Sequence, residues 1–276
     1  MKIPALNLSA IAVIPARYAS TRFPGKPLAH INGISMLQRV YEQTLEATSL
    51  SAILIATDDE RIASHAKSFG ANVALTDPSH PSGTDRIAEA IHNLYKNPKI
   101  RTDRLNKFNL QTEKTGKVNY DVIVNVQGDE PFIDPAQIDN LVQCFYDKKV
   151  QIATMVKRIT NIQEFQNPNV VKAVLASNGN ALYFSRNAIP YIRNGNIEQA
   201  ITNYPMYKHI GMYAYRDGVL TELTRLQPSD LELVESLEQL RWLQNGYTIR
   251  AIETTLETIA IDTPEDIVKA EAYLRV

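Results

Sequence analysis

Cationic side chains cluster in one loop directly after the first apolar run of the chain. The segment PARYASTRFPGKP, residues 15–27, carries Arg17, Arg22 and Lys26 among turn-forming prolines and a glycine. A polyphosphate needs cations and accessible backbone N–H groups, and ligands of open α/β sheets bind beyond the carboxyl ends of strands. The loop matches neither GxxxxGK(S/T) nor GxGxxG. We interpret it as a triphosphate site; the alternative is a Pro/Gly turn with solvated charges.

Carboxylates follow the run VIVNVQ at residues 122–127, which is apolar enough to be a central strand. In the motif QGDEP, Asp129 and Glu130 come directly after the expected strand end. Mg²⁺ is usually held by one or two carboxylates together with substrate phosphates, so a sparse acidic site is sufficient. The same residues also fit an acidic turn that caps a helix beginning at Pro135. The spacing does not separate these two interpretations.

A second acidic motif, IDTPEDI at residues 261–267, lies near the end of the chain. Thr263 as N-cap, Pro264 as the first helical residue and Asp266 near the third position describe a helix start without any function. Asp262 is not needed for this cap and comes at an expected strand end. The local pattern favours capping and leaves Asp262 unassigned.

Three further features each have a functional and a structural interpretation. The loop HPSGTDR, residues 80–86, could offer backbone N–H groups and Arg86 to an anion, or could be a plain helix start capped by Thr84. His209, in KHIGMYAY, is either part of a site or a satisfied core histidine. Arg186, in YFSR, could meet a carboxylate bidentately or pair on the surface.

The elements that position these residues follow from hydrophobic periodicity. In the first half, apolar runs alternate with helical patterns, which is typical of βαβ units and a parallel sheet. Strands are expected at residues 11–14, 52–57, 72–75 and 122–127, and helices at 36–47, 60–69, around 87–94 and from Pro135. In the second half, strands near Met155 and at 170–175, 181–184 and 209–215 indicate an antiparallel lobe. Helices at 219–226 and 233–244, strands at 247–252 and 259–261, and a helix from Pro264 complete the chain.

The net charge, the cysteine count and the N-terminal segment restrict the class of protein and its compartment. A formal net charge of −1 over 276 residues argues against a dedicated nucleic-acid or anionic-membrane binder. The single cysteine, Cys144, excludes an internal disulfide and a Cys-clustered zinc site and fits a reducing cytoplasm. The N-terminal apolar run is too short for a spanning helix and lacks signal-peptide features. We therefore expect a cytoplasmic protein with no nucleic-acid or membrane partner.

One segment departs from the α/β rhythm. Residues 96–119 are polar, without a clear period, and carry seven Lys and Arg against two Asp and Glu. RNA binding is conceivable there, but a solvated surface loop is the favoured interpretation.

The chain resembles the 3-deoxy-manno-octulosonate cytidylyltransferases, which activate the sugar acid KDO. The matching segments, in chain order, are IPARYASTRFPGKPL, ATDDERI, SGTDRIAEA, VNVQGDEPFI, NPNVVKAV, ALYFSRNAIPY, YKHIGMYAY, LEQLRWLQNG and IDTPEDI. They run from about Ile11 to the C-terminus and are interrupted mainly by the basic insertion at 96–119. One departure is Asp85 in SGTDR, where many members carry Glu; the charge is kept.

This resemblance implies a Rossmann-like α/β nucleotidyltransferase fold, with a mostly parallel central sheet and helices on both faces. It also implies a homodimer. From length and strand pattern we expect one domain over residues 1–276, with a smaller sugar-binding and dimerisation lobe at about 151–217, although the length fits two domains as well. The implied reaction joins CTP and KDO into CMP-KDO and pyrophosphate, with Mg²⁺ as cofactor, for lipopolysaccharide synthesis. The alternatives are the same chemistry on 8-amino-KDO or sialic acid, a sugar 1-phosphate nucleotidyltransferase, and a non-catalytic nucleotide-binding module.

The resemblance also assigns roles to individual residues. Arg17, Lys26, Asp129 and Asp262 would be catalytic, and the two aspartates would hold Mg²⁺. The implied CTP-binding residues are Pro15, Ala16, Arg17, Ser20, Lys26, Ser82, Gly83, Arg86, Gln127 and Asp129. The implied sugar-binding residues are Arg22, Arg186, His209, Tyr213, Glu238 and Gln239.

Overall fold

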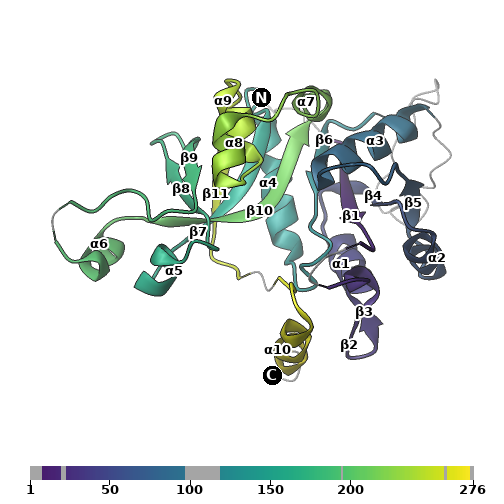
Figure 1. Ribbon diagram of the computed structural model, residues 1–276. Helices are drawn as coiled ribbons and strands as arrows, with labels where there is room; N and C mark the ends of the chain where they lie inside the picture. The colour runs from purple at the N-terminus through teal and green to yellow at the C-terminus, as the bar shows by residue number, and fades with distance from the viewer. Residues whose placement is uncertain (1–7, 20–22, 97–118, 194, 258–259, 274–276) are drawn as a thin grey trace, which may run out of the picture. The chain divides into compact units, whose positions relative to one another are not determined.

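The computed structural model describes residues 8–19, 23–96, 119–193, 195–257 and 260–273. The chain divides into two compact units, one formed by residues 1–142 with 257–276 and the other by residues 143–256 (Figure 1). The second unit extends beyond the predicted lobe at 151–217 in both directions, and one domain over 1–276 stays a prediction. All but the first and last residues of the basic insertion at 96–119 lie outside the described part of the chain.

The first unit is built on parallel strands in the order β6-β1-β4-β5. Their bounds are β1 (Ala10–Ala16), β4 (Leu50–Thr57), β5 (Asn72–Leu75) and β6 (Val122–Asn125). Every residue of β4 and β6 is buried, as expected for strands that are covered on both faces. Because β1 and β6 are parallel neighbours, the loops that follow them begin at the same edge of the sheet.

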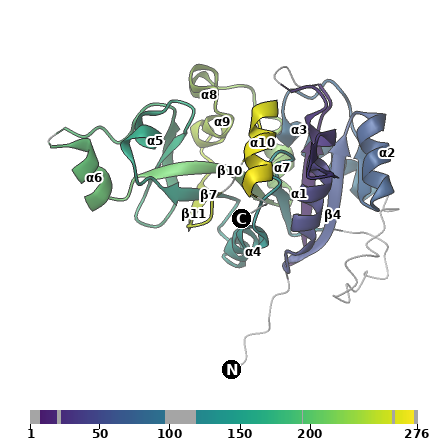
Figure 2. The same cartoon turned by 90° about the horizontal axis from the view of Figure 1, so that it is seen from below.

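Helices and one small hairpin complete the first unit. They are η1 (Lys26–Leu28), the hairpin β2 (His30–Ile31) and β3 (Ile34–Ser35), α1 (Met36–Leu45), α2 (Glu60–Ser68), α3 (Gly83–Lys96), α4 (Pro135–Gln143) and α10 (Pro264–Tyr273). α1 packs on β1 and β4, α2 on β4 and β5, and α3 on β1, β4 and β5. The right-handed rule for parallel crossovers places α3 on the face opposite to α1 and α2. Ile31, Met36, Ile261 and Ala270 form a buried cluster, so α10 packs on β2 and on the start of α1. Figure 2 shows α10 beside α1.

The second unit is mixed. Its strands are β7 (Ile152–Arg158), β8 (Lys172–Leu175), β9 (Ala181–Ser185), β10 (Tyr207–Arg216) and β11 (Ile249–Thr254). β10 pairs antiparallel with β7 and β8, β8 pairs antiparallel with β9, and β11 runs parallel to β7. Its helices are η2 (Cys144–Tyr146), α5 (Ile162–Gln166), α6 (Ile197–Asn203), α7 (Val219–Leu223), α8 (Asp230–Glu235) and α9 (Gln239–Gln244).

These elements confirm the predicted fold class, a mostly parallel sheet with helices and a smaller antiparallel part. Two element predictions are wrong. The single helix expected at 233–244 is split into α8 and α9, because Ser236 adopts the left-handed conformation (φ 52°) and ends α8. Residues 260 and 261 belong to no strand, and residue 259 of that expected strand lies outside the described residues. No helix in the described part of the chain is both long and apolar enough to cross a membrane.

Candidate active site

The first loop aims a lysine back toward the sheet. β1 ends at Ala16, exposed Arg17 follows, and Gly25 begins the short helix η1 in the left-handed conformation (φ 72°). A Cβ atom on Gly25 would lie 3.1 Å from the Tyr18 ring, so both the backbone conformation and the close approach require glycine. Lys26 is the first residue of η1, so the helix fixes the backbone position from which its side chain extends.

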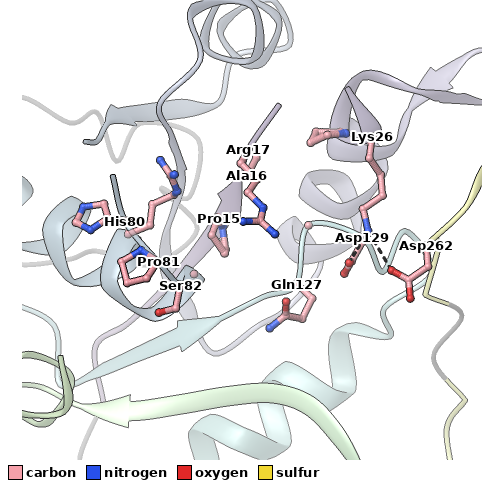
Figure 3. A pocket seen from close by; sticks show the side chains of 14 residues that line it. Pro15, Ala16, Arg17, Lys26, His80, Pro81, Ser82, Gln127, Asp129 and Asp262 are labelled. Atoms are coloured by element: carbon pink, nitrogen blue, oxygen red, sulfur yellow. Dashed lines mark hydrogen bonds and ion pairs between the residues drawn. The ribbon is translucent and has the colours of Figure 1, made fainter. Parts of the chain in front are cut away.

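Three oxygen atoms converge on the Lys26 ammonium. Nζ lies 2.8 Å from Asp129 Oδ2 and 3.4 Å from Asp262 Oδ1 (Figure 3). It also lies 2.9 Å from the Ile261 carbonyl oxygen. A backbone hydrogen bond from Ile261 N–H to the Asp129 carbonyl, 2.9 Å long, ties the two acidic segments together. The structure thus unites the loop after β6 with the segment before α10, which are distant in the sequence.

The capping alternatives do not account for either aspartate. Asp134, rather than Asp129, accepts a hydrogen bond from the first turn of α4, Ala136 N–H at 2.8 Å. At the start of α10, Asp266 accepts the N–H groups of Asp262 and Thr263 at 3.1 and 3.0 Å. The side chains of Asp129 and Asp262 therefore face Lys26 instead of capping a helix. Carboxylates that are not used in capping are what the metal-site interpretation requires.

These oxygens fit a magnesium ion in kind. Mg²⁺ takes oxygen ligands and commonly uses one or two carboxylates plus phosphates. The Asp129 and Asp262 side chains are 30% and 47% exposed, so substrate oxygens and water can reach an ion held there. Among the described residues no group of three or more His, Cys, Asp or Glu side chains could hold a metal. Two carboxylates would leave the other ligand positions of a Mg²⁺ ion to phosphates and water.

Glu130 does not add a third carboxylate. It is buried, and its Oε2 has no hydrogen-bond partner within the described residues. Burial, reinforced by the neighbouring charge of Asp129, raises the pKa of Glu130 to about 7. It is an acidic residue of the interior rather than an exposed ligand.

A cavity of about 320 Å³ lies beside these groups in the first unit. It is lined by every described residue of the predicted CTP site, which are Pro15, Ala16, Arg17, Lys26, Ser82, Gly83, Arg86, Gln127 and Asp129. Asp262 also lines it, whereas predicted Ser20 and Arg22 lie outside the described residues. Sequence reasoning missed Pro27, His80, Pro81 and Gly128, although all four belong to motifs already singled out.

Gly128 lets the two site-bearing loops approach each other. A Cβ atom there would lie 2.9 Å from the Pro15 carbonyl oxygen, closer than real Cβ contacts allow. Gln127 and Asp129 flank this glycine and both line the cavity. The glycine in QGDEP is therefore required by packing against the end of β1, a reason that the sequence alone did not reveal.

The loop before α3 forms another wall of the cavity. The Ser82 hydroxyl accepts the Asp85 N–H at 3.2 Å and donates to the Asp85 carboxylate at 2.7 Å. The predicted N-cap at Thr84 is wrong, because α3 already begins at Gly83 and Thr84 is buried in its first turn. The helix start therefore presents Ser82 and Gly83 to the cavity.

Arg86 and His80 line the cavity and are each bonded to residues that do not line it. Arg86 is buried, and its Nη1 donates to Thr76 Oγ1 at 2.6 Å and lies 3.3 Å from Asp58 Oδ1. His80 Nε2 lies 2.5 Å from Glu89 Oε2. Arg86 thus braces the ends of β4 and β5 as well as lining the cavity, a structural task that the anion-binding prediction did not include.

The second unit places His209 and Tyr213 together on β10. His209 Nε2 lies 2.9 Å from Thr154 Oγ1, and its ring centroid is 5.0 Å from that of Phe184 and 5.3 Å from that of Tyr213. Burial lowers the pKa of His209 to about 3, so the imidazole is neutral at ordinary pH. Burial first, then the charges of Tyr215 and Glu238, raise the pKa of Tyr213 well above its usual value.

The other predicted sugar-binding residues have different surroundings. Glu238 lies close enough to Tyr213 to affect its pKa, and Gln239 begins α9 with its Nε2 buried and unpartnered among the described residues. Arg186 donates to the carbonyls of Glu235 at 2.8 Å and Ser236 at 3.3 Å. Arg186 thus closes the end of α8, so the simple surface ion pair considered for it is not what the structure shows.

The fold and the site together define a class: an α/β protein that binds a nucleotide where parallel strands end and carries paired carboxylates beside the cavity. A family model described as Cytidylyltransferase matches residues 11–252. The 3-deoxy-manno-octulosonate cytidylyltransferase of Parabacteroides distasonis is 51% identical over 96% of this chain and 97% of its own length. That of Cytophaga hutchinsonii is 47% identical over 95% and 96%.

Solved structures agree with these relatives. CMP:2-keto-3-deoxy-manno-octonic acid synthetase complexed with CTP is 36% identical, with a TM-score of 0.82 over 97% of this chain and 98% of that one. The 4-diphosphocytidyl-2C-methyl-D-erythritol synthase of Anaerococcus prevotii, 12% identical with a TM-score of 0.57, shares the fold alone. This chain belongs to the 3-deoxy-manno-octulosonate cytidylyltransferase family, which confirms the resemblance and makes it a nucleotidyltransferase.

Proposed function

We propose that this enzyme joins CTP and KDO into CMP-KDO and pyrophosphate, an activation step for lipopolysaccharide synthesis. One observation carries the proposal: the Lys26 ammonium sits on Asp129, Asp262 and the Ile261 carbonyl at the edge of a nucleotide-sized cavity. The names and near full-length similarity of the relatives support KDO as the sugar acid.

The reaction requires charge neutralisation more than covalent chemistry by the protein. The anomeric hydroxyl of KDO attacks the α-phosphorus of CTP, the bond to the β-phosphate oxygen breaks, and pyrophosphate leaves. When bound, Mg²⁺ would neutralise phosphate charge and lower the pKa of the attacking hydroxyl. Asp129 and Asp262 would hold it, since both reach the edge of the cavity from distant parts of the chain.

Lys26 and the metal compete for the same oxygens. In the structure the single ammonium charge is shared between the two carboxylates, at 2.8 Å from Asp129 Oδ2 and 3.4 Å from Asp262 Oδ1. If Asp129 and Asp262 held Mg²⁺ beside CTP, their oxygens would no longer be open to the Lys26 ammonium, which would then reach toward the phosphates instead. Lys26 then joins exposed Arg17 in stabilising the charge on the leaving pyrophosphate. This exchange reconciles the predicted phosphate contact of Lys26 with its observed ion pairs.

The remaining residues divide between the two substrates. Ser82, Gly83 and Gln127 line the cavity and would orient CTP. In the second unit, His209, Tyr213 and Glu238 are the group around which the sugar acid would bind, with Gln239 beside them in sequence. The neutral imidazole of His209 would hydrogen-bond sugar hydroxyls rather than attract the carboxylate. Arg186 is the cation of this unit that we assign to the carboxylate, and the prediction for Arg22 falls outside the described residues.

We further propose that the enzyme works in the cytoplasm as a homodimer, without nucleic-acid or membrane partners. Its single cysteine suits a reducing compartment, and its net charge of −1 provides no general attraction to polyanions.

Pyrophosphate release tests the reaction directly. The purified chain is incubated with Mg²⁺, each nucleoside triphosphate and KDO, 8-amino-KDO or sialic acid, and we expect turnover only with CTP and KDO. Asp262→Asn should reduce kcat by about 10²–10³, because it removes an electrostatic contact to the reacting groups. Asp139→Asn, at an aspartate that is bonded to Ser49 and does not line the cavity, is the matched control. No pyrophosphate with any sugar acid would refute the proposal, and faster turnover with another acid would change the substrate.

A further inference from the structure

Arg61, in the first turn of α2, contacts Tyr18 in the loop that follows β1. Arg61 Cζ lies 3.4 Å from the centroid of the Tyr18 ring, in the geometry of a cation–π contact. Neither residue lines the cavity, and the reaction proposed above does not use them. The contact joins a helix to the loop that carries Arg17 and Lys26.

Asp59 fixes the guanidinium over the ring. Arg61 Nε donates to Asp59 Oδ1 at 3.0 Å and Nη2 donates to Oδ2 at 2.6 Å, a two-point ion pair. The same carboxylate is the N-cap of α2, since it accepts the N–H groups of Arg61 and Ile62. The orientation of Arg61 is therefore coupled to the start of the helix, and its fork is already occupied by a carboxylate.

Tyr18 is linked to both cations of the site. It directly follows Arg17, and its carbonyl accepts the Gly25 N–H at 2.9 Å, immediately before Lys26. The edge of its ring lies against Gly25, with Cε2, Cζ and Oη within 3.1–3.3 Å of where a Cβ would be. Both the backbone and the ring of Tyr18 thus contact Gly25, the residue directly before Lys26.

We propose that Tyr18 and Arg61 are positioning residues that hold Arg17 and Lys26 at the separation required by the triphosphate of CTP. The inference rests on the proposed reaction and adds to it the reason for this separation. Arg61 is 60% exposed, so the contact contributes little to global stability. Its effect is local, because it restricts a loop that already closes on itself through Tyr18 and Gly25.

Four variants test this role through steady-state kinetics with CTP and KDO varied separately. Tyr18→Leu and Arg61→Met should each raise KM for CTP about fivefold, the equivalent of about 1 kcal/mol for a partly exposed cation–π contact. KM for KDO should change by less than twofold. Tyr18→Phe keeps the aromatic ring and should therefore have the wild-type KM for CTP. The double variant should be no worse than either single one, because both remove the same contact.

Two controls separate positioning from general damage. Tyr247→Leu removes a tyrosine that bonds Glu222 in the second unit at 2.9 Å, and it should leave KM for CTP unchanged. The thermal midpoints of all variants should remain within a few degrees of wild type, as measured by circular dichroism.

Three results would overturn the inference. The first is an unchanged KM for CTP in Tyr18→Leu, and the second is a Tyr18→Phe variant as impaired as Tyr18→Leu. The third is additive losses in the double variant, which would indicate that Arg61 contacts the phosphates itself. An inactive wild-type enzyme would instead refute the proposed reaction, so the two failures are distinguishable.

Discussion

At the scale of single residues, the site is organised by what one lysine touches. Lys26 meets two carboxylates and a carbonyl that come from segments more than a hundred residues away. The types of these residues were evident from the sequence, but their meeting was not. The local sequence assigned Asp266 to the helix start and left Asp262 without a role; the structure agrees on Asp266, and the contact with Lys26 is what the local pattern could not show.

Replacing Lys26 with methionine should make nucleotide-free protein bind divalent metal more tightly. The ammonium is a unit charge within 4 Å of both carboxylates, where an effective dielectric constant of about 20 corresponds to about 4 kcal/mol of interaction. Its loss leaves the carboxylates without a counter-ion, so Mn²⁺ affinity measured by electron paramagnetic resonance without CTP should rise at least about tenfold. Turnover should fall in the same variant, because the phosphates lose a cation.

Lys67→Met supplies the control for net charge, since it removes an exposed lysine from α2. It should alter neither Mn²⁺ affinity nor turnover. If Lys26→Met bound Mn²⁺ no better than wild type, the ammonium and the metal would not share a position, and the exchange proposed for Lys26 would be wrong.

At the scale of elements, the strands of the first unit were predictable because apolar runs, turn residues and burial all agree. β5 was predicted with its observed bounds, and the observed β1 and β4 are each longer than predicted by only a few residues. The failures occur where a single backbone conformation decides the outcome. Leu233–Gln244 has helical periodicity throughout, but Ser236 in the left-handed conformation divides it, a choice that periodicity cannot register. Short α5 and α6, capped by Asn161 and Asn196, were also missed.

The histidine that β10 buries against β7, His209, predicts a measurable pH dependence of the free energy of unfolding. His209 is enclosed by Thr154, Phe184 and Tyr213, and burial lowers its pKa to about 3, below the ordinary value near 6.5. Below pH 6.5 the unfolded chain therefore binds a proton that the folded chain does not. The free energy of unfolding should fall with decreasing pH by up to about 1.4 kcal/mol per unit from this histidine.

Chemical denaturation between pH 4.5 and 7.5 isolates this contribution when wild type is compared with His209→Gln. The variant should show a shallower loss of stability toward acid, while other titrating groups cancel in the difference. His92→Gln, at an exposed position of α3, should behave like wild type. Parallel pH profiles for wild type and His209→Gln would contradict the buried, neutral histidine.

At the scale of the whole molecule, the chemistry is divided between two compact units. Every residue that lines the nucleotide cavity belongs to the first unit, whereas the described residues predicted to bind the sugar acid belong to the second. Composition and motif order predicted the α/β class and a smaller antiparallel part. They could not locate the division at residues 142–143 and 256–257, because the chain leaves and re-enters the first unit without any marked linker composition.

This division predicts separate footprints for the two substrates in hydrogen exchange measured by mass spectrometry. CTP with Mg²⁺ should slow exchange in peptides covering the end of β1, the start of α3 and the loop after β6, which supply the cavity walls. At 100 times Kd the protection should approach about 2.7 kcal/mol for amides that exchange only from a state unable to bind CTP. KDO alone should instead slow exchange in β10 and at the start of α9, while mannose, which lacks the carboxylate, should slow neither. Protection by CTP confined to residues 143–256 would show that the cavity is not the nucleotide site, and equal protection by mannose would remove the carboxylate from the recognition of the sugar.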